Sequence, residues 1–202
     1  MCQQLFLLRH AEVEALGVLM GQSIDAPLSE VGKAQALRWR TVLTEVPFQA
    51  VISSPARRAR DTAQLVAPTG MSILQLPHFH EMNWGAWEGK PFAEVKEALQ
   101  MQRERWAAGE WDWAPPAGES LRALLQRAEE GLRLVSSLYP AGSVLIVTHG
   151  QWLRLFLTYL MGFPITEEGR FYHRRAQLSW LVRVPAGHFY LRALAVDADT
   201  AF

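Results

Sequence analysis

The stretch Leu5-Phe-Leu-Leu-Arg-His10 begins with four apolar residues and ends on an arginine and a histidine. A short run in which every residue is apolar is typical of a strand that is buried on both faces, as in a parallel sheet. Val144-Leu-Ile-Val147 has the same character, and Thr148-His149-Gly150 follows it. The two runs predict the interior of a sheet, with a polar segment where each strand ends.

Around these two runs, helical patterns alternate with further short strands. Ser29 is the expected N-cap of a helix that ends before Pro47, and Ser54-Pro55 the expected N-cap and first residue of a helix reaching about Ala67. Three further helices are expected: one over 91–108, one from Glu119 that ends at Pro140 to Gly142, and one from Gly150 that ends at Gly162 and Pro164. Two further strands are expected over 50–53 and 72–76.

The last part of the chain predicts an antiparallel hairpin at the edge of the sheet. Residues 178–184 and 189–193 are apolar runs joined by Pro185-Ala-Gly187. Strands that alternate with helices predict an α/β fold, in which helices cover both faces of a central sheet. We therefore expect a three-layer α/β/α sandwich with a mostly parallel central sheet and an antiparallel edge hairpin.

Composition excludes several classes of protein. The 202 residues suit one domain, 1–202, and the 20 basic and 20 acidic residues give no net charge that would draw the chain to nucleic acid or an anionic membrane. No apolar run is long enough to cross a membrane, and Cys2 is the only cysteine. We expect a cytoplasmic monomer or homodimer that acts on a small molecule, without nucleic-acid or membrane partners.

Ligands of such sheets bind at the carboxyl ends of the strands. Arg9-His10, Ser53-Ser54 and Thr148-His149-Gly150 should meet there, beside a helix start that carries Arg57, Arg58 and Arg60. Arginines and a helix N-terminus neutralise phosphate oxygens, and neutral imidazole attacks phosphorus. The pattern predicts phosphoryl transfer without a metal ion or cofactor, with either His10 or His149 as the nucleophile.

Five segments resemble, in order, the motifs of the histidine phosphatase superfamily, which includes the phosphoglycerate mutases. They are Leu5–Glu12, Asp25–Gly32, Ser54–Ala63, Glu81–Gly89 and Val147–Gly150. The resemblance implies a phosphoglycerate mutase-like fold and a phosphomonoesterase that forms a phosphohistidine.

The resemblance also implies residue roles. His10 becomes phosphorylated, and Arg9, Arg58 and His149 bind the phosphoryl oxygens. Glu81 protonates the leaving oxygen and then activates water; the neighbouring Met82, Trp84 and Trp87 give an apolar setting that suits a proton donor. Further phosphate or substrate contacts are expected from Gly150, Gln22 and Ser23. Two positions depart from the family: Ala11 replaces a glycine, and Leu16 replaces an asparagine that contacts phosphate in many relatives.

The loop Gly17–Leu28 is similar to that of α-ribazole phosphatases of cobalamin biosynthesis, with Gln22 where they often have arginine. The same group has a cap segment, which resembles Trp106, Trp111-Asp-Trp113 and residues 115–120 of this chain. We therefore expect a cap-like insertion around 84–120. The implied substrate is α-ribazole 5′-phosphate, held by the flat surfaces of tryptophans 84, 87, 111 and 113.

Alternatives from other classes are open. The same pocket could serve a broad-specificity phosphatase or a phosphoglycerate mutase, and a degenerate fold could be a non-catalytic module that binds a phosphate ligand. His78-Phe-His80 followed by Glu81 could instead bind a metal ion.

Overall fold

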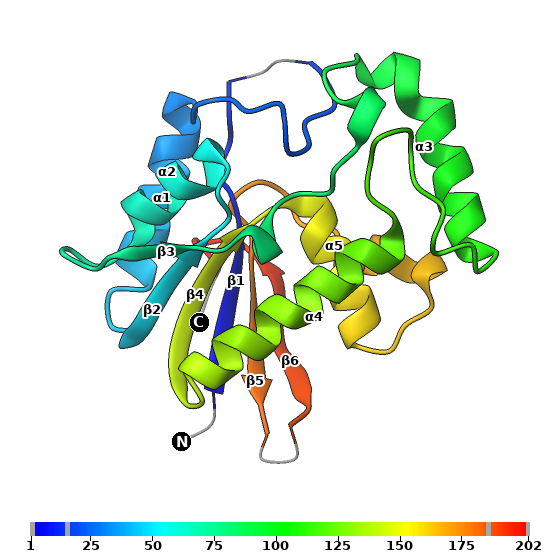
Figure 1. Cartoon of the computed structure of the whole chain (residues 1–202). Helices are drawn as coiled ribbons and strands as arrows, with labels where there is room; N and C mark the ends of the chain where they lie inside the picture. The colour runs from blue at the N-terminus through cyan, green and yellow to red at the C-terminus, as the bar shows by residue number, and fades with distance from the viewer. Residues whose placement is uncertain (1–2, 15–16, 185–186, 201–202) are drawn as a thin grey trace.

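The apolar runs of the sequence form the strands of one six-stranded sheet (Figure 1). The computed structural model of the chain describes residues 3–14, 17–184 and 187–200. The strands are β1 (Gln3–Arg9), β2 (Phe48–Ser53), β3 (Ile73–Gln75), β4 (Gly142–Thr148), β5 (Leu178–Arg183) and β6 (Phe189–Val196).

The order of the strands across the sheet is β3-β2-β4-β1-β5-β6. Strands β3, β2, β4 and β1 are parallel, β5 pairs antiparallel with β1, and β6 pairs antiparallel with β5. The predicted mostly parallel sheet with an antiparallel edge hairpin is therefore confirmed. Pro185 and Ala186 in the hairpin turn lie outside the described residues.

Helices cover both faces of this sheet. The helices are α1 (Glu30–Val42), α2 (Arg57–Val66), α3 (Phe92–Ala107), α4 (Leu121–Leu138) and α5 (Gly150–Leu160), with the 3-10 helices η1 (Pro77–Phe79), η2 (Gly85–Trp87) and η3 (Ile165–Phe171). Leu5 and Leu7 of β1 belong to one buried cluster with α4 and α5, whereas Phe6 and Leu8 belong to a second cluster with α1 and α2. Because successive side chains of a strand point to opposite faces, this division gives the three layers that the sequence predicted.

Three helices begin later than predicted: α3 begins at Phe92 and α4 at Leu121, one and two residues after the expected starts, and α2 is also displaced. Ser29 caps α1 by accepting the N–H of Gly32, as expected. Helix α2 instead begins at Arg57, two residues later than predicted, and Ala56 is its N-cap. The carboxylate of Asp25 accepts the N–H groups of Arg57 and Arg58, at 2.5 and 3.4 Å. Asp25 therefore caps the N-terminus of α2, the role that the sequence assigned to Ser54.

The carboxyl ends of β1, β2 and β4 lie at one edge of the sheet, where polar residues follow each strand. In Figure 1 residues 17–29, before α1, and the start of the segment 84–120, which includes α3, lie beyond this edge. No helix in the described part of the chain is both long and apolar enough to span a bilayer. The parallel strands thus bring the predicted rim residues together.

Candidate active site

His10 follows β1 directly and is buried, with only 2% of its surface exposed. Its backbone N–H donates to the carbonyl of Thr148 at the end of β4. The ring Nδ1 lies 2.9 Å from the carbonyl oxygen of Ala11. Because a carbonyl only accepts, Nδ1 carries the proton and Nε2 keeps its lone pair. Burial, followed by the charges of Arg175, Arg58 and Arg9, holds the pKa of His10 well below its ordinary value, so the ring is neutral.

Arg9 is the last residue of β1, and its guanidinium lies against the start of α5. Its Nη1 donates to the backbone carbonyl of His173 at 2.5 Å. A Cβ atom at Gly150 would come within 2.7 Å of the Arg9 Cζ, so the absence of a side chain there lets the guanidinium lie against the backbone. The Nε of Arg9 is buried and has no hydrogen-bond partner among the described residues.

Arg58, in the first turn of α2, is held by the loop that precedes α1. It is 1% exposed; its Nη1 donates to the Asp25 carboxylate at 2.9 Å and its Nη2 to the Gly21 carbonyl at 2.8 Å. Its Nε is also buried without a partner in the part of the chain that the structure describes. Arg57 is exposed and pairs with Asp61, and only Arg58 of this helix start reaches the cavity described below.

His149 lies between β4 and α5, directly behind His10. It is fully buried, and the two ring centroids are 5.2 Å apart. Its Nε2 is 2.7 Å from the Ser54 hydroxyl, whereas its Nδ1 is buried with no partner among the described residues. The ring of His80 stacks on the other side, 5.8 Å away. Burial and then the charge of Arg58 keep the pKa of His149 well below its usual value.

Glu81 approaches the N-terminus of α5 from the segment after η1. Its Oε1 accepts the N–H groups of Met82 and Trp152, at 2.9 and 3.0 Å, and its Oε2 accepts that of Gln151 at 3.2 Å. The carboxylate therefore has polar partners, in addition to the apolar neighbours that the sequence indicated.

These residues surround one cavity of about 310 Å³. Its lining consists of Arg9, His10, Val18, Leu19, Met20, Arg58, Glu81, Trp84, Phe92, Gly150, Gln151, Arg154, Tyr172 and Arg175. His149 is not part of this wall and reaches the site only through its place behind His10. Positive side chains outnumber the single carboxylate of the wall, so the cavity suits an anion.

A second cavity of about 450 Å³ adjoins the first and shares five lining residues with it. The shared residues are Leu19, Trp84, Phe92, Gln151 and Arg154. Its other walls come from α3, where Trp106 is apolar and Lys96 and Arg103 are cationic. The two cavities offer a phosphate-sized site and an adjoining space for the rest of a ligand.

Three of the four tryptophans expected at the ligand lie elsewhere. Trp87, Trp111 and Trp113 line neither cavity, and Trp87 is part of the buried core. The indole of Trp111 donates to the Trp106 carbonyl, and that of Trp106 donates to the Trp113 carbonyl. These two hydrogen bonds fix the segment that follows α3 against the end of that helix. Trp84 and Trp106 are the tryptophans that face the adjoining cavity, because the turn after α3 directs the Trp111-Asp-Trp113 segment towards the core.

Gln22 and Ser23 are outside the cavity wall, although both lie near it. The carboxylate of Glu88 accepts the backbone N–H of Gln22 at 2.9 Å and the Ser23 hydroxyl at 2.5 Å. The Gln22 side chain donates to the Glu81 carbonyl at 2.8 Å. Burial opposes the ionisation of Glu88, but the hydrogen bonds from Ser23 and Gln22 outweigh it and lower its pKa. In this structure both residues hold the loop beside Glu81.

The side chains proposed for a metal site do not converge. Among the described residues, no group of three or more histidine, cysteine, aspartate or glutamate side chains could hold a metal ion. The ring of His80 lies against His149, and its Nδ1 accepts the N–H of Glu81. His78 contributes its carbonyl to Arg127 and to the indole of Trp152. The geometry thus gives the His78/His80 alternative no support.

Four polar lining residues were not expected from the sequence: Gln151, Arg154, Tyr172 and Arg175. Arg154 is four residues after Gly150 on α5, so helical spacing could have placed it on the same face. Tyr172 and Arg175 come from the loop between η3 and β5, which no motif marks. Their place in the cavity depends on a tertiary contact: the backbone N–H of Arg9 donates to the Gln177 carbonyl and fixes this loop beside β1.

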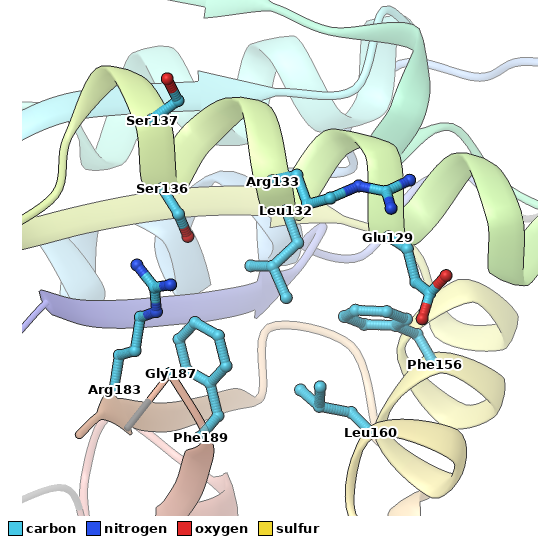
Figure 2. Close-up of a pocket in the computed structure, with 10 residues that line it drawn as sticks. All are labelled: Glu129, Leu132, Arg133, Ser136, Ser137, Phe156, Leu160, Arg183, Gly187 and Phe189. Carbon is cyan, nitrogen blue, oxygen red and sulfur yellow. The ribbon is translucent and has the colours of Figure 1, made fainter. Parts of the chain in front are cut away.

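Another hollow, of about 450 Å³, lies between α4, α5 and the β5–β6 hairpin (Figure 2). Leu132, Phe156, Leu160 and Phe189 form apolar walls, with Arg133, Arg183 and Glu129 around them. None of its lining residues belongs to the catalytic cavity. The chemistry of the histidines and arginines therefore identifies the first cavity as the candidate active site.

Comparison with known proteins agrees with the site. A family model for the histidine phosphatase superfamily (branch 1) matches residues 5–196. A protein of Escherichia fergusonii named "Probable phosphoglycerate mutase GpmB" is 30% identical over 210 residues, covering 96% of this chain and 97% of that protein. The structure of the α-ribazole phosphatase from Shigella flexneri is 28% identical, with a TM-score of 0.80 and 96% of each chain covered.

A further solved structure, YhfR of Bacillus stearothermophilus, has a TM-score of 0.85 and 26% identity, covering 97% of this chain and 98% of that one. The family match extends over nearly the whole chain, and the superfamily inferred from the five motifs is confirmed. The chain therefore belongs to branch 1 of the histidine phosphatase superfamily and is a phosphatase-type enzyme.

Proposed function

We propose that the chain hydrolyses phosphomonoesters through a phosphohistidine at His10. One observation carries this proposal: three buried nitrogen atoms around His10 have no partner among the described residues, namely Arg9 Nε, Arg58 Nε and His149 Nδ1. Buried polar atoms are nearly always hydrogen-bonded in folded proteins. The oxygens of a phosphoryl group beside His10 would give acceptors to the nitrogens of Arg9 and Arg58, whose side chains line the cavity, whereas His149 lies behind this wall.

In the first step, the lone pair of His10 Nε2 attacks phosphorus. The N–P bond forms as the bond between phosphorus and the ester oxygen breaks, and the leaving oxygen takes a proton from Glu81. The guanidinium groups of Arg9 and Arg58 neutralise the oxygens of the transferring group, which is the main requirement of phosphoryl transfer. His10 starts neutral, because burial and the neighbouring arginines lower its pKa.

In the second step, Glu81, now ionised, takes a proton from water while the water oxygen attacks phosphorus. The N–P bond breaks, its electron pair returns to Nε2, and inorganic phosphate leaves. Glu81 is thus protonated again and His10 is neutral, so the cycle closes. The backbone N–H groups that hold the Glu81 carboxylate fix its position through both steps.

We further propose α-ribazole 5′-phosphate as the substrate, with the segment 84–120 as a cap over its base. The adjoining cavity supports this choice, because Trp84, Phe92 and Trp106 offer apolar walls. The carboxamide Nε2 of Gln102, which also lines that cavity, is buried and has no partner among the described residues. A flat heteroaromatic base with a ring nitrogen as acceptor suits both features, and the similarity to the Shigella flexneri enzyme supports the same class.

A second candidate function is that of a phosphoglycerate mutase or an acid-specific phosphatase. Lys96, Arg103 and Arg154 line the adjoining cavity and would attract a carboxylate beyond the phosphate. The Escherichia fergusonii relative has the corresponding name. A broad-specificity phosphatase would use the first cavity alone, and a non-catalytic module would bind a phosphate ligand there without the proton transfers of Glu81.

A phosphate-release assay over a metabolite panel separates these functions. We expect the highest kcat/KM for α-ribazole 5′-phosphate, compared with 3-phosphoglycerate and sugar phosphates. Transfer of phosphate between phosphoglycerates in place of release would favour the mutase. Turnover of all esters at similar rates would favour the broad phosphatase, and the absence of turnover would favour the binding module.

A pair of variants tests the base-binding wall. Trp84→Ala should raise the KM for α-ribazole 5′-phosphate about fivefold or more, since stacking a base contributes roughly 1–3 kcal/mol. It should change the KM of a small phosphate ester much less. Trp111→Ala is the matched control, because this indole lies outside both cavities. Equal effects of the two variants on α-ribazole 5′-phosphate would contradict the assignment.

A further inference from the structure

Arg175 lies against the ring of His10 in the cavity that a substrate would enter. It follows η3 in the loop that leads to β5, and its guanidinium lines the catalytic cavity. Its Nη1 is 3.0 Å from His10 Nε2 and 3.2 Å from Nδ1. Because the two distances are nearly equal, Nη1 lies against the imidazole ring and not on the line of the Nε2 lone pair. The guanidinium of Arg175 therefore contacts the ring of His10 in the free protein.

The loop that carries Arg175 is fixed to the end of β1. The N–H of Ala176 donates to the His10 carbonyl, and the N–H of Arg9 donates to the Gln177 carbonyl at 3.0 Å. The indole of Trp39 donates to the Ala176 carbonyl at 2.6 Å. The backbone on both sides of Arg175 is held in this way, so a change of partner by its guanidinium requires rotation of the side chain only.

Arg175 has no ion-pair partner among the described residues, and the charges of Glu81 and Glu12 act on it more weakly than those of Arg9 and Arg58. The adjacent Arg174, in contrast, pairs with Asp197 at 2.7 Å. Burial and then the charges of Arg9 and Arg58 lower the pKa of Arg175 to about 10. A partly buried cation beside two other cations is unfavourable until an anion joins them. A phosphoryl group at His10 is the anion that the proposed function brings to this position.

We propose that Arg175 is a third phosphate-binding arginine, which exchanges its contact with the His10 ring for a hydrogen bond to a phosphoryl oxygen when the substrate enters. The exchange rests on the proposed phosphatase function and adds a residue to it. Leu16, which lies outside the described residues, stands where the family resemblance implies a phosphate-contacting asparagine, so Arg175 would supply a donor that this position lacks. A leucine side chain has no hydrogen-bond donor, whereas a guanidinium supplies a charged one.

Binding of inorganic phosphate, measured by titration calorimetry, tests this exchange without turnover. Arg175→Gln removes the charge and should weaken phosphate binding about tenfold to hundredfold, the scale expected for a hydrogen bond to a charged group. Arg175→Lys retains a charge but not the planar fork and should bind phosphate with intermediate affinity. Arg174→Gln is the control, because this neighbour is exposed and pairs with Asp197; its phosphate affinity should equal that of the wild type.

A second readout separates a direct role from a structural one. His10 is faced by Arg9, Arg58, Arg175 and Glu81, with His149 behind it, and Arg175 contributes the largest electrostatic part of its lowered pKa. Loss of that charge in Arg175→Gln should raise the pKa of His10 in the free protein, as followed by NMR titration of the imidazole. Thermal unfolding of each variant shows whether the fold is intact, and Arg175→Lys retains the test if Arg175→Gln does not fold.

The outcomes are distinct. Phosphate affinity in Arg175→Gln equal to or tighter than that of the wild type would overturn the proposal, because it would make Arg175 a cover of His10 and not a ligand. An unchanged pKa of His10 would overturn the contact from which the exchange starts. A wild-type protein that binds no phosphate would instead contradict the proposed function itself.

Discussion

Replacement of Gly150 by alanine tests the phosphate site through one methyl group. The new Cβ would lie 2.7 Å from the Arg9 Cζ and 2.9 Å from its Nε, closer than nonbonded atoms approach. The guanidinium is the far end of a flexible side chain, so Arg9 moves and the backbone stays. Such a movement breaks the bond from Arg9 Nη1 to the His173 carbonyl and displaces the group that neutralises a phosphoryl oxygen.

The size of the effect follows from the bond that is lost. A hydrogen bond to a charged group contributes about 1.5–3 kcal/mol, which corresponds to a fall in kcat/KM of about tenfold to hundredfold. The fold should lose little stability, because alanine favours helix over glycine by up to about 1 kcal/mol at Gly150, the first residue of α5, and this gain offsets part of the lost bond to His173. Steady-state kinetics and thermal unfolding measure the two effects separately.

A matched control comes from Gly169 in η3, where an added Cβ meets no atom within 4 Å. Gly169→Ala should retain wild-type kcat/KM. If Gly150→Ala also retains it, Arg9 does not hold the phosphoryl group in the way proposed.

Three other predictions follow from the site. Glu81→Gln should slow hydrolysis of alkyl phosphates roughly a hundredfold or more, but phosphorylation by p-nitrophenyl phosphate much less, since that leaving group needs no proton; equal rates of Glu81→Gln and wild type on alkyl phosphates would exclude Glu81 as the acid. Burial lowers the pKa of His80 and His173 to about 4 and that of His10 and His149 as well, so the unfolded chain binds more protons below pH 6.5 and the free energy of unfolding should fall between about pH 6.5 and 4; urea midpoints that do not change between pH 7.5 and 5 would argue against neutral buried histidines. Activity should survive exhaustive EDTA treatment and be inhibited by vanadate, and loss that zinc restores would revive the metal alternative.

The arrangement of strands was predictable because each short apolar run has a single structural interpretation. Leu5–Leu8 and Val144–Val147 became the central parallel pair β1 and β4, so the residues after them lie at the same edge. The positions of Arg9, His10 and His149 followed from this rule alone. The choice of Arg58 over Arg57 required the family motif, since spacing treats both arginines alike.

Other parts of the site depend on tertiary contacts that local sequence does not encode. Asp25 caps α2 from a distant loop, so the Ser54-Pro55 pattern misplaced the start of that helix. Trp111 and Trp113 have the composition of a binding wall, but the turn after α3 directs them to the core. Arg175 reaches His10 only because the loop before β5 is bonded to β1, a pairing between residues far apart in the chain.

The central claim is a covalent phosphoenzyme at His10, and trapping with labelled substrate tests it most directly. Rapid denaturation during turnover should give a phosphoadduct that is labile in acid and stable in base, as expected of a phosphorylated imidazole nitrogen. Proteolysis and mass analysis should locate it on the peptide that contains His10, and His10→Ala should give none. A full level of adduct in His10→Ala would contradict the account and direct attention to His149.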